Sequence, residues 1–214
     1  MSIGNSASTG YAGFNREKVA AALKIFPGEM VRKSLHLLIA LVPPMAAINK
    51  PFTLALLAVG TLVYAFAEAA RLSGKPIFLI SEITVIASRD RETGRFVLGP
   101  VTLGLGAMLA LFMYPNPASS IAIYALAFGD GLASLTGKMI GGAKVPFFGQ
   151  KTFAGSIACF LSVFIVTSAL TARPVESLVV AIAATVLEVI PFGNFDNLVI
   201  PFGVGLVASR LFIG

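Results

Sequence analysis

Long apolar runs separated by short polar segments make up most of the chain from residue 34 onward. A helix of about 20 mostly apolar residues crosses a bilayer, and seven of these runs reach or approach that length. We expect spanning helices at residues 34–48, 52–72, 96–114, 118–137, 153–172, 175–192 and 198–213. The pattern therefore predicts an all-α integral membrane protein with about seven transmembrane helices.

An eighth apolar stretch, residues 76–88, contains Glu82 and is too short to span easily. We predict that it forms an interfacial segment on the cytoplasmic side. Residues 1–30 fit either an amphipathic surface helix or a solvated tail, and no basic region leads directly into an apolar core, so we expect no cleavable signal peptide. The expected organisation is an N-terminal segment, 1–30, and a single transmembrane domain, 31–214, which would carry any catalytic residues.

Composition supports a membrane protein, because 57% of the residues are hydrophobic and only 12% are charged. Soluble domains carry about 25% charged residues, and disordered chains are poor in apolar residues. The formal net charge of +6 indicates membrane topology and anionic head groups rather than a nucleic-acid partner. With a cytoplasmic N-terminus and a non-crossing 76–88, all basic residues except Lys50, Arg173 and Arg210 lie on the cytoplasmic side. We therefore predict an outside C-terminus.

This topology brings the ionisable residues of the apolar segments to one membrane face. They are Glu29, Arg32, Lys33, His36, Glu68, Arg71, Asp130, Glu188 and Asp196, with Asn197 beside them. A transporter is expected to bind its substrate nearer the bilayer midplane. Charges collected at one interface instead favour chemistry between a soluble polyanion and a lipid head group, with the active site facing the cytoplasm.

Segment 128–156 carries the most specific chemistry. Gly129 and Gly131 bracket Asp130, so the helix can bend or open at a carboxylate of the kind that Mg²⁺ accepts beside phosphate oxygens. Amines, hydroxyls and flexible backbone follow in one loop, at Lys138, Lys144, Lys151, Thr152, Gly155 and Ser156. Such groups position and neutralise phosphates in phosphoryl transfer. The alternative interpretation of the loop is a positive-inside segment whose glycines pack helices.

The chain resembles the polyprenol kinase family in the runs Gly129-Asp130-Gly131-Leu132-Ala133-Ser134, Gly137-Lys138 and Lys151-Thr152-Phe153-Ala154-Gly155-Ser156. Three weaker elements also match: Glu29-x-x-Arg32-Lys33-x-x-His36, Arg89-x-Arg91-Glu92-Thr93-Gly94, and Ala184-Thr185-x-x-Glu188 with Asp196-Asn197-x-x-x-Pro201. The resemblance covers about residues 29–205. Phosphatidate cytidylyltransferases are in the same superfamily, but their paired-Asp signature is missing, and Asp196-Asn197 stands in that region.

The resemblance implies a multi-spanning enzyme that transfers the γ-phosphate of CTP, with Mg²⁺, to a polyprenol-, phytol- or diacylglycerol-type hydroxyl. On this hypothesis Asp130 and Lys151 are catalytic, and Asp130 either binds Mg²⁺ or accepts the hydroxyl proton. The residues expected to contact the nucleotide or its phosphates are Lys138, Lys144, Thr152, Gly155, Ser156 and Asn197. Lipid head-group or product contacts fall to Arg32, Lys33 and His36, and metal contacts to Asp130, Glu188 and Asp196.

Three other functions fit the same pattern. A phosphatidate cytidylyltransferase would place CMP rather than phosphate on the lipid. A small transporter or scramblase would consume no nucleotide. A membrane scaffold without catalytic activity would tolerate substitution of Asp130 and Lys151. The pattern favours no particular alcohol and no oligomeric state.

Overall fold

The computed structural model describes residues 28–88, 92–149 and 151–213, and within these ranges the regular structure is helical, with no β-strand. This confirms the predicted all-α class. The expected surface helix or tail before residue 28 and the basic residues Arg89 and Arg91 lie outside the described residues.

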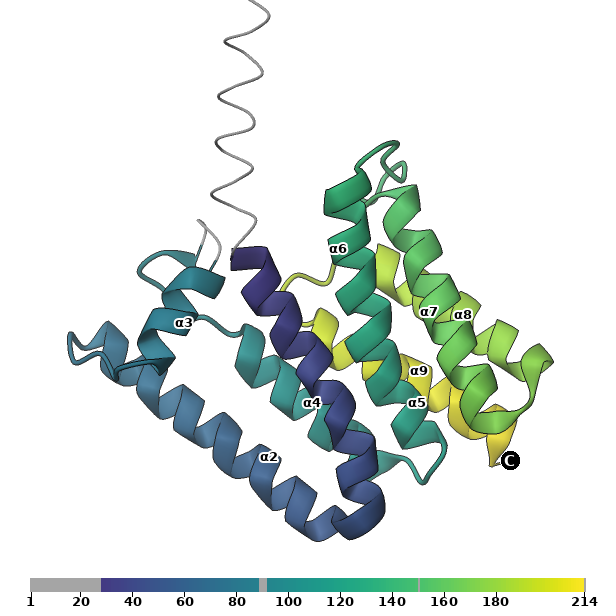
Figure 1. Ribbon diagram of the computed structural model, residues 1–214, viewed down its shortest axis with the longest axis horizontal. Coiled ribbons are helices and arrows are strands. Elements are labelled where there is room, and N and C mark those ends of the chain that lie inside the picture. The colour runs from purple at the N-terminus through teal and green to yellow at the C-terminus, as the bar shows by residue number, and fades with distance from the viewer. Residues whose placement is uncertain (1–27, 89–91, 150, 214) are drawn as a thin grey trace, which may run out of the picture.

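An N-terminal hairpin, residues 28–72, comes first in the chain (Figure 1). Residues 28–38 are α-helical, Ile39–Leu41 form a short 3₁₀ segment, and α2 follows over Val42–Leu72. The backbone leaves the helical conformation at Asn49, whose side-chain oxygen accepts the Phe52 N–H at 3.0 Å. Asn49 thus caps a second arm, and Pro51 is tolerated because the first turn of a helix needs no donor there.

The remaining helices are connected by short segments. They are α3 (Ile80–Ala87), α4 (Gly99–Met113), α5 (Ala118–Tyr124), the π-helical turn η3 (Ala125–Asp130), α6 (Gly131–Ile140), α7 (Phe153–Thr171), α8 (Pro174–Val189) and α9 (Asp196–Phe212). Each of the seven predicted spans corresponds to a helix or hairpin arm, and the short 76–88 segment contains only the eight residues of α3.

Helix 118–140, which comprises α5, η3 and α6, lies at the centre of the molecule. Ile121, Ile123 and Leu126 on it are fully buried, and two hydrophobic clusters meet there. One cluster joins α5 to α7, α8 and α9, and the other joins it to α4 and the first arm of the hairpin. This central helix fixes the position of Asp130 at the end of η3.

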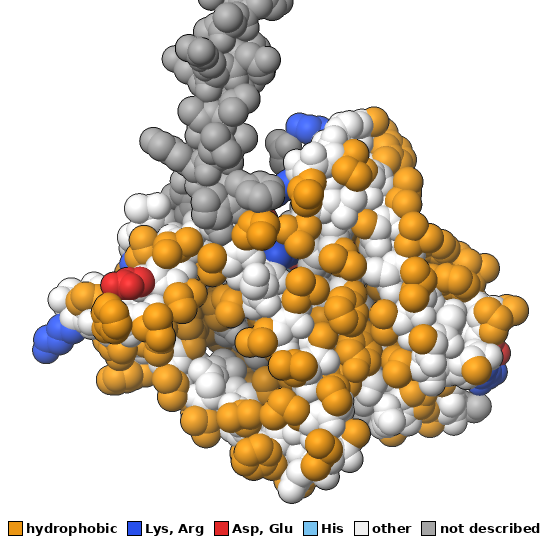
Figure 2. All heavy atoms as spheres, in the orientation of Figure 1, with side chains coloured by type: hydrophobic (Ala, Val, Ile, Leu, Met, Phe, Trp, Pro, Cys, Tyr) orange, Lys and Arg blue, Asp and Glu red, His pale blue; other side chains and the backbone are white. Residues whose placement is uncertain are grey.

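The outer helices expose apolar side chains, as expected for a protein surrounded by lipid. Figure 2 shows hydrophobic side chains across the visible face, with only a few charged side chains among them. Among the residues that the structure describes, three helices are long and apolar enough to cross a membrane, namely Gly28–Leu72, Ala118–Ile140 and Phe153–Thr171. Gly99–Met113 is a shorter apolar helix. The chain is therefore an all-α membrane protein. The number of spans and their orientation remain predictions.

Candidate functional site

A cavity of about 1270 Å³ lies between the N-terminal hairpin, α3, α4, α6 and the segments that precede α7 and α9. Every residue predicted from the sequence to form the site lines this cavity except Ser156. These residues are Arg32, Lys33, His36, Asp130, Lys138, Lys144, Lys151, Thr152, Gly155, Glu188, Asp196 and Asn197. Residues that are far apart in the sequence are thus brought to one place, while their individual roles remain predictions.

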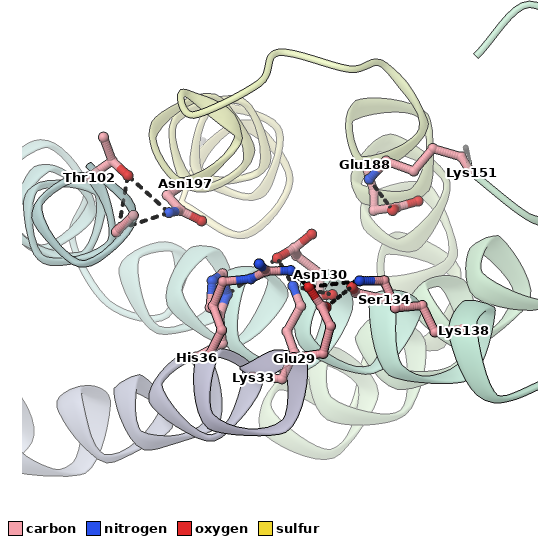
Figure 3. A network of polar contacts seen from close by, with 12 residues as sticks. Glu29, Lys33, His36, Thr102, Asp130, Ser134, Lys138, Lys151, Glu188 and Asn197 are labelled. Atoms are coloured by element: carbon pink, nitrogen blue, oxygen red, sulfur yellow. Dashed lines mark hydrogen bonds and ion pairs between the residues drawn. The ribbon is translucent and has the colours of Figure 1, made fainter. Parts of the chain in front are cut away.

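Asp130 ends the π-helical turn and is only 7% exposed. Such turns occur often at functional sites because they redirect side chains within a helix. The Lys33 ammonium donates a hydrogen bond to Asp130 Oδ2 at 2.8 Å, and His36 Nδ1 lies 3.2 Å from the same oxygen without forming a hydrogen bond (Figure 3). Gly129 lets this turn approach α7, since a Cβ atom there would lie 3.0 Å from the Val163 side chain.

The first arm of the hairpin supplies the groups that surround Asp130. Glu29, Lys33 and His36 are spaced by four and three residues, so they share one face of the helix. Glu29 forms salt bridges with Arg32 and with Lys138 of α6, the latter at 2.7 Å. The sequence reasoning assigned no role to Glu29, although its spacing from Lys33 and His36 was a signal that it faces the site.

A second ion pair joins Lys151, just before α7, to the buried Glu188 of α8 at 2.5 Å. Burial lowers the pKa of the Lys151 ammonium, but the Glu188 carboxylate outweighs this effect and holds the pKa above its ordinary value. Lys151 therefore stays cationic at neutral pH. Figure 3 shows this pair on the side of the site opposite His36.

The loop between α6 and α7 is closed by backbone hydrogen bonds. Val145 N–H donates to the Lys151 carbonyl at 2.9 Å, and Phe153 N–H donates to the Ala143 carbonyl at 3.1 Å. The Thr152 hydroxyl caps α7 by accepting the Gly155 N–H, and the Ser156 hydroxyl donates to the Thr152 carbonyl. Both hydroxyls predicted to contact phosphate thus have local partners in this structure.

Asp196 and Asn197 stabilise the start of α9. Asp196 accepts the Phe192 N–H at 2.8 Å, and the Asn197 amide donates to Thr102 Oγ1 at 2.9 Å and to the Gly99 carbonyl. Within the described ranges, no three His, Cys, Asp or Glu side chains come together as a metal site. The three predicted metal ligands therefore do not form a ready-made cluster, because Asp130, Glu188 and Asp196 each have a different local partner.

Sequence reasoning also left Glu68 and Arg71 out of the site. Glu68 is fully buried, receives two hydrogen bonds from Arg71, and accepts the Val97 N–H at 2.8 Å. Tyr64 donates to the Val97 carbonyl at 3.0 Å. These bonds fix the segment before α4 against α2 and hold one wall of the cavity.

The geometry defines a class of membrane protein in which a buried carboxylate and several lysines lie in a partly apolar cavity. Comparison with known proteins then finds proteins of similar sequence. The chain is 34% identical over 140 residues to a probable phytol kinase 2, chloroplastic, from Glycine max, and 30% identical over 144 residues to a probable phytol kinase, chloroplastic, from Zea mays. These matches cover 56% and 58% of this chain and 48% and 47% of the two relatives.

A phytol kinase from Synechocystis is 33% identical over 108 residues, which are 45% of this chain and 46% of that protein. The chain is thus related to the phytol kinases, which confirms the resemblance to the polyprenol kinase family. It spans about half the length of the curated relatives it matches. No family model and no solved structure matches the chain.

Proposed function

We propose that the protein transfers the terminal phosphate of CTP to the hydroxyl group of a lipid alcohol at the cytoplasmic membrane face. The observation that carries this proposal is the cavity, which joins the buried Asp130–Lys33 pair to a lysine-lined end and to an apolar end. A polyanionic nucleotide and a lipid hydroxyl would meet at that pair. Relatedness to phytol kinases supports an alcohol as the acceptor, and CTP as the donor follows from the family resemblance.

In the proposed reaction the alcohol oxygen attacks the γ-phosphorus, the bond to the bridging oxygen breaks, and CDP leaves. Asp130 accepts the hydroxyl proton, while Lys33 fixes one carboxylate oxygen and so orients the group. Lys138, Lys144 and Lys151 would neutralise the phosphate oxygens, since phosphoryl transfer depends mainly on positioning and charge stabilisation.

Mg²⁺ is commonly held by one or two carboxylates together with substrate phosphates, so the lack of a three-ligand cluster among the described residues is compatible with it. Glu188 and Asp196 line the same cavity and are the side chains that would hold it. When bound, the ion would neutralise charge on the nucleotide phosphates.

Doubly labelled nucleotide tests the reaction. Purified protein in lipid nanodiscs receives Mg²⁺ with CTP labelled at either the γ- or the α-phosphate, and is offered phytol, farnesol, diacylglycerol and phosphatidic acid. We expect only the γ label to reach a lipid, and only an alcohol. Transfer of the α label to phosphatidic acid would identify a cytidylyltransferase instead, and no labelled lipid would contradict the kinase for these acceptors.

Replacing Asp130 tests the assignment of the proton acceptor. Asp130→Asn keeps the shape of the side chain but removes its charge and basicity, so we expect turnover to fall by about 100-fold or more. Glu176→Gln is the matched control, because Glu176 pairs with Arg173 at the start of α8, outside the cavity lining. Equal activity of the two variants would exclude Asp130 as the base.

A further inference from the structure

We propose that the apolar limb of the cavity holds the hydrocarbon tail of the lipid alcohol, and that Gly60 determines how long a tail the limb accepts. The apolar limb is the part of the cavity lined by Leu38, Leu41, Met45, Leu57, Gly60 and Ile83. The identity of the head group rests on the proposed function, whereas the position of the tail rests on the shape and lining of the cavity.

The polar and apolar lining residues follow one another along a single helix arm. Lys33 and His36 contact Asp130, and Leu38, Leu41 and Met45 come next on the same arm. From His36 to Met45 the arm rises by about 13 Å at 1.5 Å per residue. The cavity therefore changes from charged to apolar along its length, which fits a ligand with a polar group at one end of an apolar chain.

The charged end of the cavity favours a small head group. Asp130 is 7% exposed and Lys33 is 4% exposed, so little space surrounds their contact. A single hydroxyl group fits such a space better than the bulky head group of a phospholipid. Leu38 and Leu41 of the limb are 61% and 55% exposed, which leaves the limb open for a chain to enter from the membrane.

Gly60 is an open position in the wall of the limb. A Cβ atom on Gly60 would have no neighbour within 4 Å, whereas one on Gly104 would lie 2.2 Å from Thr61 Oγ1. The helices α2 and α4 thus approach at Thr61 and Gly104, while the adjacent Gly60 leaves space. Gly60 and Leu38 both lie eleven residues from the bend at Asn49, so they occupy similar levels of the two arms.

We expect the limb to discriminate among lipid tails of different length by steric exclusion. A tail that leaves lipid hydrocarbon for an apolar cavity gains little from burial, because both environments exclude water. A tail that overlaps a side chain, by contrast, binds less tightly because the cavity is overpacked. A larger residue at position 60 should therefore exclude long tails and retain short ones.

Gly60→Phe and Val59→Phe form a matched pair of variants for this test. Both place Phe in the interior of α2, but Val59 is 58% exposed and does not line the cavity. Replacing a helical glycine also raises helix propensity, so Gly60→Phe should fold. Phosphorylation of phytol and of the shorter geraniol is compared in nanodiscs, together with photo-crosslinking by a phytol analogue that carries a diazirine on its tail.

We expect Gly60→Phe to lower kcat/KM for phytol by about tenfold relative to geraniol, as a moderate overpacking penalty predicts, and Val59→Phe to leave the ratio unchanged. Crosslinks in the wild type should map to the lining residues of the limb, Leu38, Leu41, Met45, Leu57 and Ile83, and decrease in Gly60→Phe. If both variants phosphorylated the two alcohols with the same kcat/KM ratio, the tail assignment would be overturned, while the proposed kinase activity would stand. Crosslinks in the limb without phosphorylation would support the tail site and contradict the kinase, and crosslinks spread evenly over the outer surface would show that bulk lipid fills the limb.

Discussion

Lys33 and Asp130 are 97 residues apart in the sequence, yet their side chains form a buried ion pair at the centre of the site. Removing one partner of such a pair leaves an uncompensated charge, which is typically far more costly than replacing both partners. Stability and activity can therefore be separated at this pair.

We expect Lys33→Met to lower the free energy of unfolding by about 3–5 kcal/mol, because Asp130 is then buried without its cation. The double variant Lys33→Met/Asp130→Asn should recover much of this loss while remaining inactive. Thermal unfolding in a mild detergent measures both effects. Lys138→Met is the comparison, since Lys138 is about half exposed and should cost less than about 1 kcal/mol. Additive losses in the double variant would show that Lys33 and Asp130 are not coupled.

At this scale the sequence identified twelve of the residues that line the cavity but not their partners. Asp130 was found because a carboxylate in an apolar run is costly and therefore noticeable. Lys33 was placed at the lipid head group instead, and Glu29 was assigned no role. Which charges pair across 97 residues depends on how helices pack, and hydrophobic patterning does not contain that information.

At the scale of elements, α4 and α9 pack closely where Gly106 meets the backbone of Asn197. A Cβ atom at Gly106 would lie 1.9 Å from the Asn197 carbonyl oxygen, so the helices would have to separate. The Asn197 amide also donates a hydrogen bond to the hydroxyl of Thr102, which lies on α4 with Gly106. Both contacts hold the start of α9 against α4, at the edge of the cavity.

Gly106→Ala should therefore destabilise the protein by about 1–3 kcal/mol, the usual cost of overpacking. Gly60→Ala is the control, because the added methyl group has open space and slightly favours the helix. Unfolding temperatures of the two variants in the same detergent provide the measurement. If Gly106→Ala were as stable as Gly60→Ala, the described contact between α4 and α9 would be wrong.

The helices themselves were predictable, since each apolar run of sufficient length forms one. The bend at Asn49 falls in the gap between the predicted spans 34–48 and 52–72, close to Pro51. A continuous helix over Gly28–Leu72 would extend for about 68 Å, more than twice the apolar thickness of a bilayer. The bend turns this stretch into two arms and makes the cavity between them possible.

For the whole molecule, the predicted topology places residues before and after α3 on the same side of the membrane. The eight residues of α3 extend for about 12 Å, far less than the apolar layer. Lys75 and the fully exposed Phe147 should then both face the cytoplasm, and Lys50 should face the opposite side.

Single-cysteine labelling tests this arrangement. Cys159 is the only cysteine and is buried, so Lys75→Cys, Phe147→Cys and Lys50→Cys can be compared in a Cys159→Ala background. A membrane-impermeant maleimide applied to inside-out vesicles should label the first two positions and spare the third. Labelling of Lys75→Cys and Phe147→Cys from opposite sides would mean that an odd number of crossings separates them.

The ion pairs of the site have a consequence for its selectivity among anions. Lys33, Lys138 and Lys151 face Asp130, Glu29 and Glu188, so three of the lysines around the cavity already have internal counterions. Any incoming anion must compete with these carboxylates. A membrane surface offers many singly charged phosphodiesters, which compete poorly, whereas a triphosphate brings several charges at once. If the proposed function holds, the paired lysines would therefore favour a triphosphate over the single charge of a phospholipid head group.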